Sequence, residues 1–319
     1  MKISQKLPLL VLLGPTAVGK TALSVELADR LNAEIISGDS MQFYRYMDIG
    51  TAKIRPAEML SKRGRLIKHH LLDIVDPDEP FSVADFQQQA GRKIAEIAAK
   101  GKLPMLVGGT GLYIQALVDG YELAETAPGD EELRAKLQAE YQMLGAGVMH
   151  QRLAAVDAAS AARIAPEDAK RLVRALEVFS LTGKPISEQG RAAESPYNLL
   201  LVGLNRERDE LYRRIELRVD IMLADGFADE VRRLLAMGFA ADHKPMQGLG
   251  YRQLGQYFNG DLAYDEAVQL IKRDTRRFAK RQLTWWRRDE RVRWFNPAEL
   301  SEDELLAAVC AEARKQFAI

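Results

Sequence analysis

Cysteine is almost absent from the sequence: Cys310 is the only one in 319 residues. A single cysteine excludes an internal disulfide and a cysteine-based metal site, and it is typical of a protein from a reducing compartment. Net charge is absent as well, because 45 Lys and Arg balance 45 Asp and Glu. The overall charge therefore gives no sign of a polyanionic partner, although its distribution along the chain still could.

Long apolar runs are also missing. No run approaches the roughly 20 residues that a membrane-spanning helix needs. The apolar segment 7–13 superficially resembles a signal peptide, but it has no cleavage region and leads straight into the motif described next. We therefore expect a cytoplasmic protein that makes no contact with a membrane.

A phosphate-binding loop is the most informative feature that is present. Residues 14–21 read Gly-Pro-Thr-Ala-Val-Gly-Lys-Thr, which matches the pattern G-x-x-x-x-G-K-T. The apolar segment 7–13 predicts a buried strand before the loop, and leucines spaced by four predict a helix over 21–31. Backbone N–H groups of such a loop and the positive end of the helix bind an anion. The pattern predicts a di- or triphosphate site, to which Lys20 adds a charge and Thr21 a hydroxyl for Mg²⁺.

One carboxylate that often accompanies this loop is missing. Many nucleoside triphosphatases and kinases carry a later apolar strand that ends in Asp, which helps to hold the metal. The best later strand, 103–107, is followed by Gly-Gly-Thr-Gly at 108–111 instead. The first acidic residue at a strand end is Asp39, which follows the apolar segment 33–37. Strand ends of an open parallel sheet face the ligand crevice, so we expect Asp39 to point at the phosphate site or at a group that reacts beside it.

The pattern of elements indicates an α/β protein with a helical insertion. Four segments read as strands separated by helical patterns: 7–13, 33–37, 103–107 and 198–204. Residues 122–195 are rich in Ala, Leu, Arg and Glu and contain no convincing strand. We therefore predict a P-loop NTPase-like parallel sheet core, formed by 1–121 and 196–319 with a helical C-terminal part, and an inserted all-helical lobe at 122–195.

A basic stretch near the C-terminus carries interleaved aromatic residues. Residues 271–293 read as the last long helical stretch and contain ten Lys or Arg against three Asp or Glu. Trp285, Trp286 and Trp294 lie within or beside it. A basic run is commonly a solvated helix face. A positive groove with stacking platforms is also how proteins bind single-stranded nucleic acid, and both interpretations remain open from this stretch alone.

An ordered series of motifs narrows the choice. The matching segments are 14–21, 39–42 (Asp-Ser-Met-Gln), 47–53, 69–73, 84–86, 108–113, 174–177, 250–252 and 279–285. The phosphate loop alone would admit many families, whereas the whole series resembles the bacterial tRNA dimethylallyltransferases of the tRNA isopentenyltransferase family. Members of this family attach the dimethylallyl group of dimethylallyl diphosphate to N6 of adenosine 37, beside the anticodon. The resemblance implies that the loop holds a leaving diphosphate rather than ATP, which agrees with the missing carboxylate.

The resemblance also implies roles for individual residues. Asp39 matches the base near N6, Arg218 an arginine that clamps the diphosphate, and Thr110 a residue close to the transferred group. N6 of adenine is a poor nucleophile, so the reaction needs such a base, and it needs cations or donors on the leaving group. Mg²⁺ is expected beside Thr21. The implied diphosphate contacts are Gly14, Thr16, Ala17, Val18, Gly19, Lys20 and Thr21.

The implied macromolecular partner is the anticodon stem-loop of tRNA. Adenosine 37 is stacked in that loop, so its base must be extruded before its edge can react. We expect the protein to act as a monomer. The implied tRNA contacts are Asp39, Ser40, Met41, Gln42, Thr110, Arg134, Lys170, Arg171, Leu172, Val173, Arg174, Gln247, Gly248, Leu249, Gly250, Tyr251, Arg252, Lys280, Arg281, Gln282, Leu283, Thr284, Trp285, Trp286 and Arg287.

Three other functions compete with this interpretation. A small-molecule kinase or nucleoside triphosphatase is what the loop alone would favour, but the absent strand-end carboxylate counts against it. Transfer of dimethylallyl to free adenine nucleotides would leave the helical insertion and the basic stretch without a purpose. A catalytically silent RNA-binding adaptor would have no need of an intact Lys20, Thr21, Asp39 and Arg218.

Overall fold

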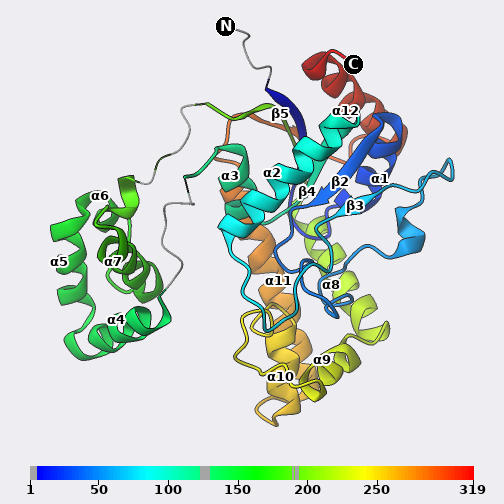
Figure 1. The fold of residues 1–319 in the computed structure, drawn as a ribbon. Helices are drawn as coiled ribbons and strands as arrows, with labels where there is room; N and C mark the ends of the chain where they lie inside the picture. The colour runs from blue at the N-terminus through cyan, green and yellow to red at the C-terminus, as the bar shows by residue number, and fades with distance from the viewer. Residues whose placement is uncertain (1–5, 123–129, 189, 191–193) are drawn as a thin grey trace, which may run out of the picture. The chain divides into compact units, whose positions relative to one another are not determined.

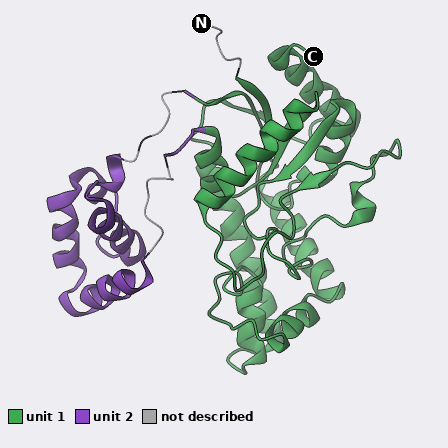
Figure 2. Cartoon of the chain, in the orientation of Figure 1, with its two compact units in different colours: residues 1–118, 195–319 green, residues 119–194 purple. Residues whose placement is uncertain are grey.

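The computed structural model describes residues 6–122, 130–188, 190 and 194–319. Contacts divide the chain into two compact units, 1–118 with 195–319 and 119–194 (Figure 2). The insertion that the sequence indicates, 122–195, begins three residues later and ends one residue later than the second unit. Parts of that segment, 123–129, 189 and 191–193, lie outside the described residues.

The first unit is built on a parallel sheet, which confirms the predicted α/β core (Figure 1). Its strand order is β3-β2-β4-β1-β5-β6, and every neighbouring pair is parallel. The strands are β1 (Leu7–Leu13), β2 (Ala33–Ser37), β3 (His69–His70), β4 (Leu103–Gly108), β5 (Tyr197–Leu204) and β6 (Val292–Phe295). The carboxyl ends of β2, β4 and β1 therefore lie side by side, which brings the residues that follow these strands to one edge of the sheet.

Helices cover both faces of this sheet. Alternate residues of β1 enter opposite cores: Leu9, Val11 and Leu13 pack against α2 (Val83–Ala99) and α3 (Gly111–Val118), and the intervening leucines pack against α1 (Lys20–Arg30) and α12 (Glu302–Phe317). The two-residue period of a strand makes such a double burial the natural result of an unbroken apolar run. Capping boxes at Ser82 and Ser301 start α2 and α12.

A helical region completes the first unit. Its helices are α8 (Arg208–Ala224), α9 (Phe227–Ala236), α10 (Tyr251–Phe258) and α11 (Tyr264–Trp286), and a short 3-10 helix, η1, covers Pro56–Met59. A third core joins these helices to the segment after β2, with Phe227, Tyr251 and Met47 fully buried. The predicted helix at 271–293 is wrong at its C-terminal end, because α11 stops at Trp286 and the chain returns to the sheet as β6.

The second unit is a helical lobe with its own core. It contains α4 (Glu131–Leu144), α5 (Ala146–Val156), α6 (Ala158–Ala161), α7 (Ala169–Thr182) and the 3-10 helix η3 (Ile186–Glu188). Leu137, Met149, Leu153, Leu172 and Leu176 form the centre of this core. Asp130 and Asp168 cap α4 and α7 by accepting backbone N–H groups.

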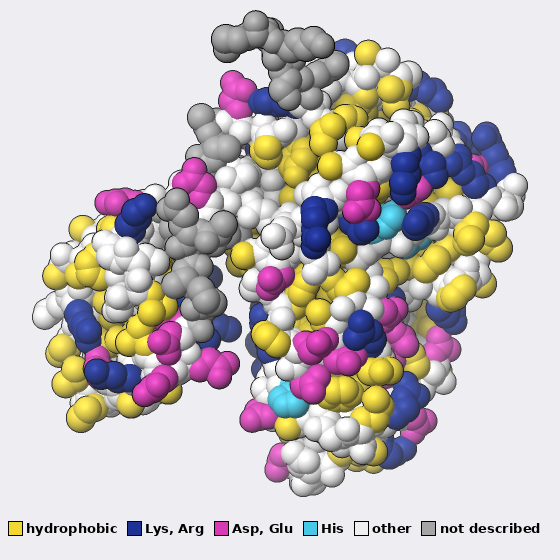
Figure 3. Space-filling model, viewed as in Figure 1, with side chains coloured by type: hydrophobic (Ala, Val, Ile, Leu, Met, Phe, Trp, Pro, Cys, Tyr) yellow, Lys and Arg dark blue, Asp and Glu magenta, His cyan; other side chains and the backbone are white. Residues whose placement is uncertain are grey.

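Acidic and basic side chains are interspersed over the face of the first unit that Figure 3 shows. This distribution agrees with the equal numbers of the two charge types in the sequence. Within the described residues, no helix combines the length and the apolar character that crossing a membrane requires.

Candidate active site

The phosphate loop joins β1 to α1, and its backbone is tightly constrained. Gly14, Ala17 and Gly19 have φ angles of 148°, 63° and 110°. A Cβ atom on Gly14 would lie 2.6 Å from the carbonyl oxygen of Leu204, so this position has no room for a side chain. Gly19 caps α1 without any side-chain hydrogen bond. The first N–H groups of α1 are thus left for an anion rather than for a capping side chain.

Cationic side chains hold the carbonyl groups of this loop. Lys20 Nζ donates to the carbonyls of Gly14 and Pro15 at 2.9 and 2.7 Å. Arg214 Nε donates to the carbonyl of Ala17 at 2.9 Å, and Arg206 Nε donates to that of Val18 at 3.2 Å. With these carbonyl groups occupied, the loop is fixed in a conformation that presents positive groups to a ligand.

A cavity of about 760 Å³ opens beside the loop. Its walls come from the phosphate loop, from the segment around Asp48–Lys53 and from the face of α8 that carries Arg214 and Arg218. Burial and the charge of Arg218 lower the pKa of Lys20 to about 7. Burial also lowers the pKa of Arg218, against the opposing charges of Asp39 and Glu58. Two desolvated cations at one cavity favour a polyanionic ligand, because its charge would offset the cost of burying them.

Asp39 follows β2 and lies within the field of both cations. Its carboxylate accepts the N–H of Met41 at 3.0 Å. Burial raises the pKa of Asp39, while the bond from Met41 and the charges of Lys20 and Arg218 act in the opposite direction. The structure therefore brings the charges of Lys20, Asp39 and Arg218 together from three different parts of the chain. A carboxylate whose pKa is raised is suited to accept a proton near neutral pH.

Thr110 lies next to Asp39 because the ends of β4 and β2 approach closely. The N–H of Ser40 donates to Thr110 Oγ1 at 3.2 Å, and the hydroxyls of Ser40 and Thr110 are 3.5 Å apart. A Cβ atom on Gly108 would lie 2.5 Å from the carbonyl group of Gly38, so the close approach depends on this glycine. The turn that follows β4 thus places Thr110 against the segment of Asp39.

Gln42, an implied tRNA contact, is partly buried and is hydrogen-bonded to other residues of the protein. Its side-chain oxygen accepts the hydroxyl of Ser37 at 2.9 Å, and its amide nitrogen donates to the carbonyls of Thr51 and Ala52 at 3.3 and 3.4 Å. The structure therefore uses this side chain to hold the wall of the cavity. To hydrogen-bond a tRNA base, the side chain of Gln42 would have to break these bonds within the protein.

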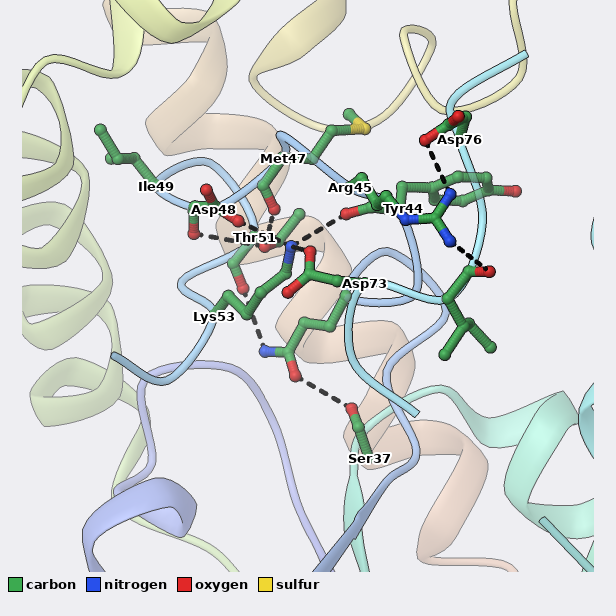
Figure 4. Close-up of polar contacts among 12 residues, drawn as sticks. Ser37, Tyr44, Arg45, Met47, Asp48, Ile49, Thr51, Lys53, Asp73 and Asp76 are labelled. Carbon is green, nitrogen blue, oxygen red and sulfur yellow. Dashed lines mark hydrogen bonds and ion pairs between the residues drawn. The ribbon is translucent and has the colours of Figure 1, made fainter. Parts of the chain in front are cut away.

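Lys53 secures the same wall from within (Figure 4). Its side chain is only 5% exposed. Its ammonium group donates to the carbonyl of Tyr44 at 2.9 Å and to the carboxylates of Asp48 and Asp73 at 2.7 and 2.5 Å. A buried ammonium with three acceptors is fully satisfied, so Lys53 belongs to the framework of the cavity.

Glu230 on α9 is a residue of this framework that sequence reasoning missed. Its buried carboxylate accepts the N–H groups of Asp48, Ile49 and Gly50 at 3.0, 2.7 and 3.1 Å. It also accepts the hydroxyl of Tyr251 at 2.7 Å. No local pattern marks Glu230, because the three N–H groups that it accepts lie about 180 residues away along the chain. The carboxylate fixes a segment that lines the cavity together with the phosphate loop.

The comparison with known families decides between the interpretations left open above. Residues 42–289 match the family described as IPP transferase. The chain belongs to this family. Similar curated proteins are the tRNA dimethylallyltransferases of Symbiobacterium thermophilum, 56% identical over 293 residues (91% of this chain and 90% of the relative), and of Carboxydothermus hydrogenoformans, 48% identical over 308 residues (96% and 97%).

Solved structures of this family share the fold. The tRNA isopentenylpyrophosphate transferase of Bacillus halodurans is 44% identical and superposes with a TM-score of 0.73, over 98% of this chain and 97% of that one. A eukaryotic dimethylallyltransferase, described as acting on tRNA, is 27% identical with a TM-score of 0.78, over 95% of this chain and 77% of its own.

Several of the implied tRNA contacts are buried in the fold. The side chains of Leu172, Val173, Tyr251, Gln282 and Trp286 are between 0 and 6% exposed. Leu172 and Val173 belong to the core of the helical lobe, and Trp286 packs beneath the sheet. The expectation of side-chain contact with tRNA does not hold for these five, because they pack against other parts of the protein.

Arg134 and Arg174, two of the implied tRNA contacts in the helical lobe, form ion pairs with a buried carboxylate. Glu177 has no exposed side-chain surface, and it accepts hydrogen bonds from Arg134 at 2.9 Å and from Arg174 at 2.8 Å. Burial opposes ionisation of Glu177, but the bonds from Arg174 and Arg134 outweigh it and lower its pKa. These arginines are needed to neutralise Glu177, so they are less free for phosphates than the sequence suggested.

Gly250 is buried as well, and the remaining implied contacts are exposed or partly buried. The implied contacts with exposed side chains are Gln247 before α10, Arg252 on α10, Lys280, Arg281, Thr284 and Trp285 on α11, and Arg287 directly after α11. Lys170 and Arg171 are exposed at the start of α7, in the helical lobe. Ser40, Met41, Gly248, Leu249 and Leu283 are partly buried. Contact of these residues with tRNA stays a prediction.

Proposed function

We propose that this protein transfers the dimethylallyl group of dimethylallyl diphosphate to N6 of adenosine 37, next to the anticodon of tRNA, and releases diphosphate. The observation that carries the proposal is the meeting of a phosphate loop, two desolvated cations and the carboxylate of Asp39 at one site. Membership of the IPP transferase family supports this use of the site over a kinase or an adaptor. The names of its relatives support tRNA as the acceptor.

The chemistry follows from the charges at this site. The bond between C1 of the dimethylallyl group and the diphosphate oxygen breaks, and a bond between C1 and N6 of adenine forms. Lys20, Arg218 and the N–H groups at the start of α1 stabilise the negative charge on the departing diphosphate. Asp39 accepts the proton that N6 loses. Thr110, which is bonded to the backbone beside Asp39, lines the path of the transferred group.

Mg²⁺ fits this site as a partner of the diphosphate. Magnesium keeps several waters and binds phosphate oxygens, with only one or two ligands from the protein. Thr21 lines the cavity and offers one hydroxyl. Among the described residues there is no group of three or more His, Cys, Asp or Glu side chains that could cage a metal. When bound, the ion would neutralise part of the charge on the leaving diphosphate.

The acceptor is a macromolecule in this proposal. Exposed cations and Trp285 on α11 suit the phosphates and bases of an anticodon loop. The residues that line the cavity all belong to the first unit, and we propose that the protein acts as a monomer.

An acceptor assay tests the proposal. The protein is incubated with radiolabelled dimethylallyl diphosphate and Mg²⁺, together with unmodified tRNA, with AMP or with no acceptor. The proposal predicts that label enters tRNA alone. Label in AMP would instead establish transfer to free nucleotides, and ATP hydrolysis that is rapid and independent of tRNA would support the kinase or triphosphatase function.

A further inference from the structure

The Gln282 side chain bridges two parts of the active site from inside the fold. It projects from α11 and is 6% exposed. Its oxygen accepts the N–H of Thr16 in the phosphate loop at 2.9 Å. Its nitrogen donates to the carbonyl of Gly109, in the turn after β4, at 3.1 Å. Only one orientation of the amide satisfies both partners, because the N–H of Thr16 must donate and the carbonyl of Gly109 must accept.

The turn after β4 is shaped to receive α11. A Cβ atom on Gly109 would lie 2.2 Å from the Gln282 amide nitrogen and 3.0 Å from the carbonyl oxygen of Gly14. A Cβ atom on Gly111 would lie 2.7 Å from the ring of Trp285. Gln282 and Trp285 are three residues apart and share one face of the helix. The two glycines therefore allow α11 to seat directly on the turn that carries Thr110.

We propose that Gln282 is a positioning residue for the transfer reaction, which ties the phosphate loop at Thr16 to the turn of Thr110 so that the diphosphate and the transferred group are held in register. The inference rests on the proposed function, which places the diphosphate at the loop and the dimethylallyl group near Thr110. It replaces the role as an RNA contact that the resemblance implied. A misplacement of reacting groups by about 1 Å can cost about 100-fold in rate, so a bond that fixes both flanks of the site has a direct effect on the chemical step.

The same helix carries exposed cations on its other side. Lys280 and Arg281 are exposed, whereas Gln282 faces inward. A helix that touches RNA with one face and the phosphate loop with the other keeps the acceptor and the donor in a fixed relation. Gln282 is the residue through which α11 makes hydrogen bonds to both Thr16 and Gly109.

The first test compares two buried glutamines. Gln282→Met removes both hydrogen bonds at similar volume. Gln253→Met is a matched control, because Gln253 is 1% exposed, accepts the N–H of Gly250 at 2.9 Å and donates to Asp274 at 3.0 Å, away from the phosphate loop. The measurements are the melting temperature, the affinity for inorganic diphosphate by calorimetry, and the single-turnover rate of transfer at saturating substrates.

The expected results separate positioning from general stability. Both variants should lose melting temperature to a similar extent. Gln282→Met alone should bind diphosphate about tenfold more weakly, which is the upper range for one lost hydrogen bond. It should also transfer about 100-fold more slowly. Diphosphate affinity and rate equal to the wild type in Gln282→Met, or an equal loss of diphosphate affinity in Gln253→Met, would overturn the proposal.

A second variant, Gln282→Glu, tests the pH dependence of the transfer rate, which a purely structural role of Gln282 would leave unchanged. In Gln282→Glu the neutral carboxylic acid can accept from Thr16 and donate to Gly109, but the ionised form loses the donor. Burial raises the pKa of such a carboxyl group, so the change falls in an accessible pH range. The rate of Gln282→Glu, divided by that of the wild type at the same pH, should therefore rise as the pH falls from about 8 to about 5.5. A flat ratio contradicts the proposal.

Failure of the proposed function and failure of the positioning role of Gln282 give different results. If the wild type transfers no label to tRNA, the proposed function fails, whatever the variants do. If the wild type transfers label and the Gln282 variants match it, the positioning role alone fails.

Discussion

Lys20 and Arg218 face the same cavity, and burial, together with the charge of Arg218, lowers the pKa of Lys20 to about 7. Two cations so placed destabilise each other unless an anion comes between them. Asp39 supplies one negative charge, which opposes the lowering of both pKa values by burial. The arrangement leaves room for further negative charge, which a diphosphate carries.

Binding of the donor should therefore take up protons. Lys20 has a pKa of about 7 in the free protein, and a bound diphosphate would favour its charged form and raise that pKa. The sign follows: below pH 7 Lys20 is charged before and after binding, whereas above pH 7 binding must add a proton. Affinity for dimethylallyl diphosphate should fall by up to about tenfold per pH unit above 7. Calorimetry in two buffers of different ionisation enthalpy measures the uptake, and Lys20→Met should remove it.

Replacing the proposed base should affect chemistry and spare binding. Asp39→Asn should lower the single-turnover rate by about 100- to 10,000-fold, which is the usual contribution of a general base. Both substrates should still bind. Asp209→Asn, an exposed carboxylate at the start of α8, should keep the wild-type rate. A near-normal rate in Asp39→Asn would remove Asp39 from the reaction.

Glu230 should contribute more to the free energy of unfolding than its neighbour Asp229 does. Glu230→Gln removes the charge that holds three N–H groups and the hydroxyl of Tyr251. We expect the free energy of unfolding to fall by about 2–4 kcal/mol, because buried donors lose an ionised partner. Asp229→Asn on the same helix should cost less than about 1 kcal/mol, since this carboxylate is exposed and its ion pair with Arg232 lies at the surface. Urea denaturation of both variants checks the difference, and equal losses would refute the proposed importance of the buried contact.

Salt dependence should identify the cations that touch tRNA. Arg281→Glu should weaken binding of an anticodon stem-loop and lower the slope of log affinity against log salt by roughly one unit, as expected for a lost phosphate contact. Arg276→Gln is the control, because Arg276 lies on the same helix and is paired with Glu216. Identical slopes for wild type and Arg281→Glu would show that this arginine does not contact a phosphate.

The sequence predicted those parts of the molecule that depend on local patterns. The strand β1, the phosphate loop and α1 follow from an apolar run, fixed glycines and a helical period, and they were found within one residue. β3 has only two residues, and β6 interrupts a basic stretch that reads as helix, so neither was visible.

Long-range contacts could not be predicted in the same way. Gln282 meets Thr16 across 266 positions, and Glu230 meets Ile49 across 181. The positions of Gln282 and Glu230 depend on how helices pack against distant turns, and the residues next to them in the sequence do not indicate this packing. The motif around Gln282 was visible in the sequence, but its inward direction depends on which face of α11 meets Gly109 and Gly111.

The most direct test of the account is the position of the transferred group. A wild-type reaction with radiolabelled dimethylallyl diphosphate and an anticodon stem-loop that contains adenosine 37 is digested to nucleosides, and the labelled nucleoside is identified by mass spectrometry. A matched stem-loop with guanosine at position 37 is treated in the same way. The proposed transfer predicts label only on N6 of adenosine 37 and none in the guanosine substrate. Label on another atom or nucleotide, or equal label in both substrates, would contradict it.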